Sequence, residues 1–382
     1  MEEKKLVVLQ VLPELNQGGV ELGTIEIASE LQKRGIENYV ASEGGRMEPA
    51  LERLKVKHFV LPLKTKNIFK MYLNSLRLAK IIKKYNINIV HARSRAPAWS
   101  AYWAAKRCGV HFVTTFHGTY GLGPKGIKKI YNKVMTFGER VIAISGHIKQ
   151  HIMKNYGVSE DKIRLIHRCV NMENFDVENT SAERMIKFLE TYEIPEDKPL
   201  ITLIGRLTNW KGQKVLLKAL ELIKDEDFCA LLIGDDQGRT KYSDELKAMV
   251  EKFGLEGRVY FIRHIADIPA VMMTSDVVLS TSIEPEAFGR IAIEGQSMGR
   301  IVVASDIGGS KETVIDGVTG RLYKYDSAED LAEKLRWALH LSNVEREKIG
   351  EAAIKNVKEH FTKQIMCDKT ISVYEEILNS KK

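Results

Sequence analysis

Short runs of Val, Ile and Leu alternate along the whole chain with longer stretches in which apolar residues recur every three or four positions. The short runs predict strands that are buried on both faces, and the longer stretches predict amphipathic helices. This alternation predicts an α/β protein with doubly wound parallel sheets. The expected strands are Leu6–Leu12, Glu37–Ala41, His58–Leu61, Ile87–His91, His111–Phe116, Arg140–Ile144, Leu200–Gly205, Ala230–Gly234, Arg258–Ile262, Val277–Ser280 and Ile301–Ala304.

The alternation slackens over residues 168–198, a polar stretch rich in asparagine, and then restarts. Such a stretch is typical of a domain boundary, and 382 residues are enough for two or three domains. We therefore predict two Rossmann-like domains, residues 1–185 and 186–365, that face each other across a cleft. Residues 366–382 are expected to form a helix that packs back on the N-terminal domain.

The composition is that of an ordinary globular chain, with 44% hydrophobic and 28% charged residues, and it excludes a disordered or collagen-like protein. No run of 18 apolar residues exists, so no membrane-spanning helix is expected. The segment Met1–Pro13 suits a buried first strand better than a signal peptide. Because the cysteines are scattered and lack zinc-ligand spacing, we expect a cytoplasmic protein without disulfides or structural zinc. They are Cys108, Cys169, Cys229 and Cys367.

Positive charge is concentrated in the first half of the chain. Residues 1–190 contain 31 Lys and Arg against 18 Asp and Glu, whereas the remainder contains 27 against 32. Between Arg53 and Gly138 there are 18 basic residues and no acidic one. Such a field attracts nucleic acid, anionic lipid or a phosphorylated substrate.

Two segments of this basic region, Lys64–Tyr85 and Gly123–Lys133, are rich in lysine, and the first has a row of large apolar residues. We expect the apolar row to pack mostly in the core, so that the lysines provide the main attraction to a membrane. The hypothesis is a peripheral, salt-reversible association with the cytoplasmic face of the inner membrane. Nucleic-acid binding is disfavoured, because no known motif is present and the aromatic residues of the region fall at apolar helical positions. These are Phe69, Tyr72, Trp99, Tyr102 and Trp103.

Candidate chemistry begins with Gly18-Gly19, between the first strand and the first helix, where glycine lets backbone N–H groups approach a phosphate. The surrounding sequence lacks both the dinucleotide fingerprint and a Walker A loop. The strand Ile201–Ile204 is followed by Arg206 and Lys211. In open parallel sheets ligands bind beyond the carboxyl ends of strands, so these two cations are placed at a ligand-binding edge.

Downstream, residues 282–299 are expected to form a loop, a tight turn and a helix. Glu286 lies in the loop, and Glu294, eight residues later, is placed about two turns into the helix. The helix start, near Phe288–Ile291, offers unpaired N–H groups for an anion. Carboxylates only accept hydrogen bonds, so the two glutamates suit sugar hydroxyls.

These motifs resemble those of the GT-B glycosyltransferases of the large retaining group that includes sucrose-phosphate, glycogen and lipid-glycan synthases. The resemblance covers nearly the whole chain. It rests on Gly18-Gly19, His117 after its strand, Gly205-Arg206-Leu207 with Lys211-Gly212, the pair Glu286-x7-Glu294 around Phe288-Gly289, and Asp306-x-Gly308-Gly309-x-x-Glu312. It departs from the family in Gly234-Asp235-Asp236, where the family often has Gly-x-Gly-Pro.

The resemblance implies a retaining, metal-independent hexosyltransferase that moves a sugar from a nucleotide-diphosphate sugar to a glycan or lipid-linked acceptor, without a cofactor. The basic first half of the chain leads us to expect a role in cell-envelope glycan synthesis, of the lipopolysaccharide type. The implied catalytic residues are Arg206, Lys211, Glu286 and His117. The implied donor-binding residues are Gly18, Gly19, Phe288, Gly289, Arg290, Ile291 and Glu294, with Arg290 equally able to face solvent. His91 and Arg93 are candidates on the acceptor side, with His91 expected to point into the cleft. A sugar-nucleotide epimerase of the same fold is the alternative enzyme.

Overall fold

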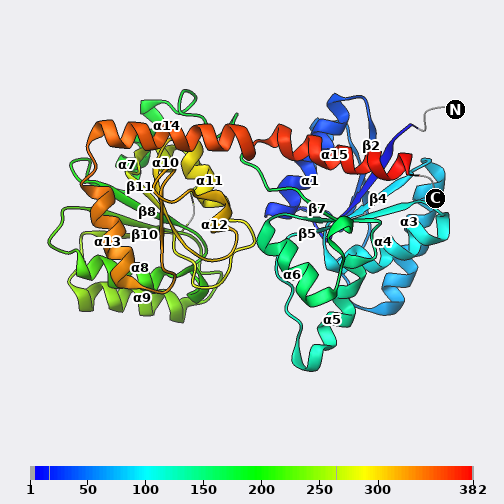
Figure 1. The fold of residues 1–382 in the computed structure, drawn as a ribbon, viewed down its shortest axis with the longest axis horizontal. Coiled ribbons are helices and arrows are strands. Elements are labelled where there is room, and N and C mark those ends of the chain that lie inside the picture. The colour runs from blue at the N-terminus through cyan, green and yellow to red at the C-terminus, as the bar shows by residue number, and fades with distance from the viewer. Residues whose placement is uncertain (1–4, 17, 264, 381–382) are drawn as a thin grey trace. The chain divides into compact units, whose positions relative to one another are not determined.

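The computed structural model of the protein describes residues 5–16, 18–263 and 265–380. The chain divides into two compact units. Met1–Arg168 together with Gln364–Lys382 form unit 1, and Cys169–Lys363 form unit 2. Each unit contains a parallel β-sheet covered by helices (Figure 1). The predicted fold class, two Rossmann-like α/β domains, is therefore confirmed.

The sheet of unit 1 has the strand order β3-β2-β1-β4-β5-β6-β7. The order reverses between β1 and β4, which pair in parallel with Val11 opposite Ala92. This reversal creates a topological switch point at the carboxyl ends of the strands, where α/β sheets bind ligands. The strands are β1 (Val7–Val11), β2 (Glu37–Ser42), β3 (Lys57–Val60), β4 (Ile89–Ala92), β5 (His111–Phe116), β6 (Arg140–Ala143) and β7 (Ile163–Leu165). The helices are α1 (Gly19–Lys33), α2 (Glu48–Arg53), α3 (Ile68–Lys84), α4 (Arg95–Cys108), α5 (Ile127–Asn132), α6 (Gly146–Tyr156) and α15 (Lys363–Asn379).

The sheet of unit 2 has the equivalent order β10-β9-β8-β11-β12-β13. Alternate strand residues face opposite sides. Leu203 and Leu279 pack with α8, α9 and α13, whereas Val278 and Val302 pack with α10 and α11. The strands are β8 (Leu200–Ile204), β9 (Cys229–Ile233), β10 (Val259–Ile262), β11 (Val277–Ser280), β12 (Ile301–Ser305) and β13 (Arg321–Tyr323). The helices are α7 (Ala182–Thr191), α8 (Gln213–Leu222), α9 (Thr240–Phe253), α10 (Ile268–Thr274), α11 (Arg290–Ser297), α12 (Ser310–Thr313), α13 (Ala328–Leu339) and α14 (Asn343–His360).

Helix α3 differs from the sequence expectation. Its later turns bury Leu78 and Ile82 as an amphipathic helix should. Its first turns instead expose large apolar side chains, including Phe69 at 78% and Tyr72 at 50%. The predictions that the apolar row of Lys64–Tyr85 is mostly core, and that these two aromatics are buried, are wrong for this end of the helix.

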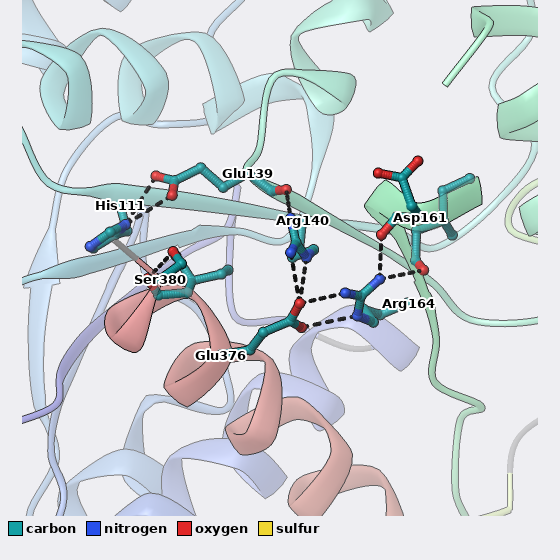
Figure 2. A network of polar contacts seen from close by, with 9 residues as sticks. His111, Glu139, Arg140, Asp161, Arg164, Glu376 and Ser380 are labelled. Atoms are coloured by element: carbon teal, nitrogen blue, oxygen red, sulfur yellow. Dashed lines mark hydrogen bonds and ion pairs between the residues drawn. The ribbon is translucent and has the colours of Figure 1, made fainter. Parts of the chain in front are cut away.

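Helix α15 is fixed to the sheet of unit 1 by an ion-pair network centred on Glu376 (Figure 2). Arg140, on β6, donates from Nε to the Glu376 carboxylate at 2.8 Å, and Arg164, on β7, donates from Nε at 3.0 Å. The adjacent Glu139 carboxylate contacts Nδ1 of His111 at 3.0 Å. The C-terminal helix is thus joined to the two strands at one edge of the sheet.

In the ranges that the structure describes, every helix is too short or too polar to cross a bilayer.

Candidate functional site

Three loops meet at the carboxyl ends of the adjacent strands β8, β11 and β12 of unit 2. The backbone N–H of Ile283, after β11, donates to the carbonyl of Trp210, after β8, at 2.9 Å. The backbone N–H of Gly309, after β12, donates to the carbonyl of Glu286 at 2.8 Å. The Thr281 hydroxyl donates to the Lys211 carbonyl at 2.8 Å. These bonds hold the loops that carry the sequence motifs in one cluster.

Glycine is required where these loops approach each other most closely. Gly212 has φ +73°, and a Cβ there would lie 1.9 Å from the carbonyl oxygen of Thr281. Gly308 has φ +64°, and a Cβ there would lie 2.6 Å from the carbonyl oxygen of Glu286. A side chain at either position would combine a strained backbone with a clash. The glycines of the motifs therefore set the spacing of the loops.

Lys211 and Glu286 form an ion pair at the centre of the cluster. The ammonium Nζ lies 2.5 Å from Oε1 of the carboxylate, and the two side chains are only 15% and 12% exposed. The Ser282 hydroxyl donates to the same oxygen at 2.5 Å. The Lys211 ammonium also lies 4.5 Å from the centre of the Trp210 ring, a favourable position for a cation. A half-enclosed positive group is thus held in place by one carboxylate and one aromatic face.

A second ion pair lies at the start of helix α11. Gly289, in the left-handed conformation, precedes the helix, and Arg290 is its first residue. The Arg290 guanidinium donates to the carboxylate of Glu294, which is 5% exposed. Glu294 lies one turn into the helix rather than the expected two, because the helix begins only at Arg290. Arg290 is 35% exposed, and its guanidinium points toward Glu294 rather than into solvent.

The other donor-side candidates of unit 2 surround these pairs. Arg206 is exposed, with its guanidinium carbon 5.9 Å from the centre of the Trp210 ring. Its carbonyl accepts a hydrogen bond from the Gln213 side chain at 2.9 Å. Phe288 is buried, whereas Ile291 is partly exposed. Arg206 is therefore the cation of the cluster that is open to solvent, and Lys211 is the enclosed one.

Asp235 and Asp236, the departure from the family pattern, stabilise their own loop. Asp236 accepts a hydrogen bond from the backbone N–H of Gly238 at 2.9 Å. Arg263 lies 3.4 Å from the same carboxylate. The hydrogen bond to Gly238, with help from Arg263, lowers the pKa of Asp236. These contacts give the carboxylate a structural role in a tight turn.

In unit 1, the candidate Arg93 follows β4 directly, at the topological switch point, and His117 follows the neighbouring strand β5. Nε2 of His117 and Nε of Arg93 are buried and have no hydrogen-bond partner among the described residues. Burial, with the positive charge of Arg93 next in importance, holds the pKa of His117 well below its usual value. Burial also lowers the pKa of Arg93 to about 10. The imidazole is therefore neutral at pH 7, beside a guanidinium that is still charged.

His91 does not point to an open site, contrary to expectation. It is fully buried, with Nδ1 2.6 Å from the hydroxyl of Tyr374 and Nε2 2.7 Å from that of Thr115. Burial, assisted by the charge of Arg93, holds the pKa of His91 well below its usual value. A neutral imidazole has one donor and one acceptor, so the two hydroxyls satisfy it completely. In this arrangement His91 connects elements within unit 1.

A buried ion pair extends this polar region. Arg168 lies 3.3 Å from the carboxylate of Glu26 on α1, and both side chains are at most 5% exposed. A Cβ on Gly23 would lie 2.1 Å from the Arg168 guanidinium, so glycine leaves room for it. Gly18 and Gly19 form the N-terminal end of the same helix, α1. Gln17, which precedes them in the motif, lies outside the described residues.

The structure therefore brings Lys211, Glu286 and the start of α11 together in unit 2, and His117 and Arg93 together in unit 1. Three contact residues of these sites were not predicted from the sequence, namely Trp210, Ser282 and Tyr374. Trp210 is next to Lys211, and an aromatic residue beside a candidate cation was the available signal. For Tyr374 no local signal exists, because 283 positions separate it from His91.

Comparisons with known proteins support the two-domain α/β fold. A family model described as glycosyl transferases group 1 matches residues 186–356, and one described as glycosyltransferase family 4 matches residues 17–174. The crystal structure of a glycosyltransferase from Rickettsia africae ESF-5 is 40% identical, with a TM-score of 0.93 and coverage of 99% of this chain and 100% of that one. Anabaena Alr3699/HepE in complex with UDP-glucose has a TM-score of 0.81 at 23% identity, with coverage of 97% and 100%.

Among curated proteins, an uncharacterized glycosyltransferase of Methanocaldococcus jannaschii is 28% identical over 240 residues, which are 62% of this chain and 59% of that protein. The chain spans about half to three fifths of the length of the first such relatives. The two units and their loop clusters define a protein of the GT-B fold. The chain belongs to the group 1 glycosyltransferases, the family predicted from its motifs.

Proposed function

We propose that the protein is a retaining, metal-independent glycosyltransferase that moves a sugar from a nucleotide-diphosphate sugar to a glycan or lipid-linked acceptor. The observation that carries the proposal is the enclosed Lys211–Glu286 pair at the carboxyl ends of β8 and β11. It combines a cation suited to a diphosphate with a carboxylate suited to sugar hydroxyls. Because UDP-glucose occupies the Anabaena protein of the same fold, UDP-glucose is the first donor to test.

In this proposal, donor binding rearranges the ion pair. The diphosphate replaces Glu286 as the partner of Lys211, and Arg206 adds a second positive charge from the solvent side. The released Glu286 carboxylate then accepts hydrogen bonds from hydroxyls of the transferred sugar, and backbone N–H groups near Phe288–Ile291 donate to the sugar. Glu294 binds the ribose hydroxyls, and Arg290 is freed to contact the donor phosphate.

The reaction breaks the bond between the anomeric carbon and the diphosphate oxygen, and negative charge accumulates on the leaving group. Fixed cations stabilise that charge most strongly in the transition state. The acceptor oxygen forms a bond to the anomeric carbon on the same face, and its proton passes to the leaving diphosphate. The configuration is therefore retained without a covalent sugar–enzyme intermediate, and the cations take the place of a divalent metal.

His117 is the proposed substrate contact in unit 1. Its imidazole is neutral and has a free Nε2, so it can accept or donate one hydrogen bond to a sugar hydroxyl without adding charge. Arg93, with an unpaired Nε, is the proposed cation beside it. The acid-free segment between Arg53 and Gly138 supports an anionic or membrane-presented acceptor, as in cell-envelope glycan synthesis on the cytoplasmic side.

The proposal is tested by screening UDP-, GDP- and ADP-sugars for thermal stabilisation of the protein, followed by an assay for release of the free nucleoside diphosphate. We expect one donor to raise the melting temperature and to be consumed with release of its nucleoside diphosphate. An epimerase would return an intact sugar nucleotide with one inverted centre. Stabilisation by none of the donors would reject the proposed donor site.

A further inference from the structure

Large apolar side chains are exposed on two neighbouring parts of unit 1. On the first turns of α3, Ile68 and Phe69 are 62% and 78% exposed, and on α5 Ile127 and Ile130 are 68% and 73% exposed. Tyr72 and Leu73 continue the α3 group and are half exposed. Positions 68, 69, 72 and 73 lie on one side of a helix, as do 127 and 130. Both helices therefore present an apolar edge to solvent.

The two edges are connected on the surface. A groove lined by Lys66, just before α3, also has Ile127, Lys128 and Tyr131 of the α5 region on its walls. Helix α4 contributes Arg95 to the same groove, and its Trp99 indole donates to the carbonyl of Tyr131 at 3.0 Å. The segment just before α3, the start of α4 and α5 thus line one groove, and Ile68 follows Lys66 by two positions.

The lysines beside these apolar edges are not paired with carboxylates in the ranges that the structure describes. Lys66, Lys70, Lys128 and Lys129 are exposed beside the apolar side chains, and in the described part of the chain no carboxylate lies within ion-pair distance of them. No acidic residue occurs in the sequence between Arg53 and Gly138. We call the six apolar residues with these four lysines the insertion surface.

The chemistry of the insertion surface fits one occupant, an anionic bilayer. Apolar side chains flanked by lysines can enter the boundary between headgroups and acyl chains while the ammonium groups contact anionic headgroups. A second copy that docked through the same surface would bring like positive charges together. A nucleic acid would contact the lysines, but four of the six apolar residues are aliphatic and offer no ring on which a base can stack.

We propose that unit 1 binds anionic membranes by inserting the apolar edges of α3 and α5, so that the association includes a component that salt does not remove. The proposal deepens the proposed function, since it rests on an acceptor presented at a membrane. It goes beyond electrostatic attraction, because the exposed isoleucines and Phe69 contact the bilayer directly.

The test uses the full chain and co-sedimentation with vesicles of phosphatidylcholine alone or with one third phosphatidylglycerol, at low and high salt. The variant Phe69→Ser/Ile127→Ser/Ile130→Ser removes the apolar contacts, and Lys70→Gln/Lys128→Gln removes charge. Val344→Ser is the matched control, because Val344 is 75% exposed on α14 of unit 2. We expect the triple variant to bind anionic vesicles at least tenfold more weakly and to lose the salt-resistant fraction. The lysine variant should lose mainly salt-sensitive binding, and the control should match the wild type.

Insertion is measured separately with Phe69→Trp, whose fluorescence should shift to the blue on anionic vesicles, whereas Val344→Trp should not shift. Unchanged binding of the triple variant would overturn the proposal and leave an electrostatic contact only. Self-association of the wild type that the triple variant abolishes would identify a second copy as the occupant, and retention of single-stranded DNA lost in the same variant would identify a nucleic acid. Release of nucleoside diphosphate from the donor is measured on every variant. If the wild type releases no nucleoside diphosphate, the proposed transferase activity is rejected. If a variant that no longer binds vesicles still releases it, the substitutions have impaired membrane binding and not catalysis.

Discussion

The hydroxyl of Tyr374, on the C-terminal helix α15, lies 2.6 Å from Nδ1 of His91, at the carboxyl end of β4. On its other side, the His91 imidazole contacts the Thr115 hydroxyl on β5 at 2.7 Å. The chain of contacts joins the last helix of the protein to the two strands that lead into Arg93 and His117. Helix α15 therefore supports the part of the sheet that carries the candidates of unit 1.

We predict that Tyr374→Phe destabilises the protein by about 1–3 kcal/mol, because the ring still fills its space while a buried ring nitrogen of His91 loses its partner. Urea unfolding of the full chain measures the change. Tyr72→Phe is the control, since Tyr72 is half exposed and its hydroxyl has only a 3.4 Å contact with Arg107. Equal stability of Tyr374→Phe and the wild type would show that the hydrogen bond contributes nothing.

The second prediction concerns Lys211 and Arg206, the two cations proposed to bind the donor diphosphate. Lys211→Ala and Arg206→Ala should each lower kcat/KM by one to two orders of magnitude or more. In the proposed mechanism, each substitution removes a charge-assisted contact to the leaving diphosphate, worth about 1.5–3 kcal/mol. Lys214→Ala is the control, because Lys214 lies on the adjacent helix and pairs with Glu245 at 2.7 Å. Normal kinetics in both site variants, with the donor identified, would reject their assignment.

The third prediction concerns whether protein cations or a divalent metal ion stabilise the leaving diphosphate. In the proposed mechanism the negative charge of the diphosphate is stabilised by Arg206, Lys211 and the start of α11. Turnover in the presence of a chelator should therefore equal turnover with Mg²⁺ or Mn²⁺. Initial rates with EDTA, and after metal is added back, measure this. A loss of activity that either metal restores would mean that a divalent ion, not the protein, stabilises the leaving group.

Most strands could be predicted from the sequence because their residues are continuously apolar and buried on both faces. The strands β7 (Ile163–Leu165) and β13 (Arg321–Tyr323) were missed. Each is a three-residue edge strand with an arginine in it, and it leaves no apolar run to detect. The sequence places Lys211 and Glu286 after the ends of strands, but the ion pair between them could not be predicted from it. The Tyr374–His91 contact could not be predicted, since it depends on how a distant helix packs.

The first turns of α3 are a segment whose burial could not be predicted from the sequence. The spacing of the apolar residues correctly predicts a helix. The spacing does not show which turns of the helix pack against the rest of the unit and which extend beyond it. Leu78 and Ile82 pack inward, whereas Phe69 lies beyond that contact and is exposed. An amphipathic pattern therefore indicates a face, and only the packing of the neighbouring elements decides whether it is buried.

The fourth prediction tests the spacing of the loops in unit 2. Gly212→Ala should reduce both stability and turnover, because a Cβ 1.9 Å from the Thr281 carbonyl oxygen must push the loops apart. Gly238→Ala is a matched control. It has nearly the same φ, +77° against +73°, but nothing lies within 4 Å of the added carbon. Both variants have backbone strain of about 1 kcal/mol, so the difference between their melting temperatures measures the clash alone. Similar losses of stability and turnover in the two variants would show that the loops accommodate the extra carbon at Gly212 without further cost.

The last prediction concerns acid stability at the edge of unit 1. The hydrogen bond from Arg164, followed in importance by that from Arg140, lowers the pKa of Glu376 below its ordinary value of 4.5 (Figure 2). A carboxylate whose pKa is lower in the folded state stabilises the fold above its unfolded pKa, and this stabilisation is lost as the pH falls through the folded value. We therefore expect Glu376→Gln to be less stable than the wild type at pH 7, and the difference to shrink below about pH 4.5.

The expected difference at pH 7 is about 1 kcal/mol, since Glu376 is one third exposed and solvent screens its ion pairs. Urea unfolding at pH 7 and at pH 3.5 measures it, with Glu359→Gln as the control. Glu359 is exposed, and its ion-pair contact with Lys355 is 3.9 Å long. If Glu376→Gln and Glu359→Gln changed the free energy of unfolding equally at both pH values, the network would not hold α15 to the sheet. A larger, pH-dependent loss in Glu376→Gln alone would show that two arginines on separate strands fix the C-terminal helix through one carboxylate.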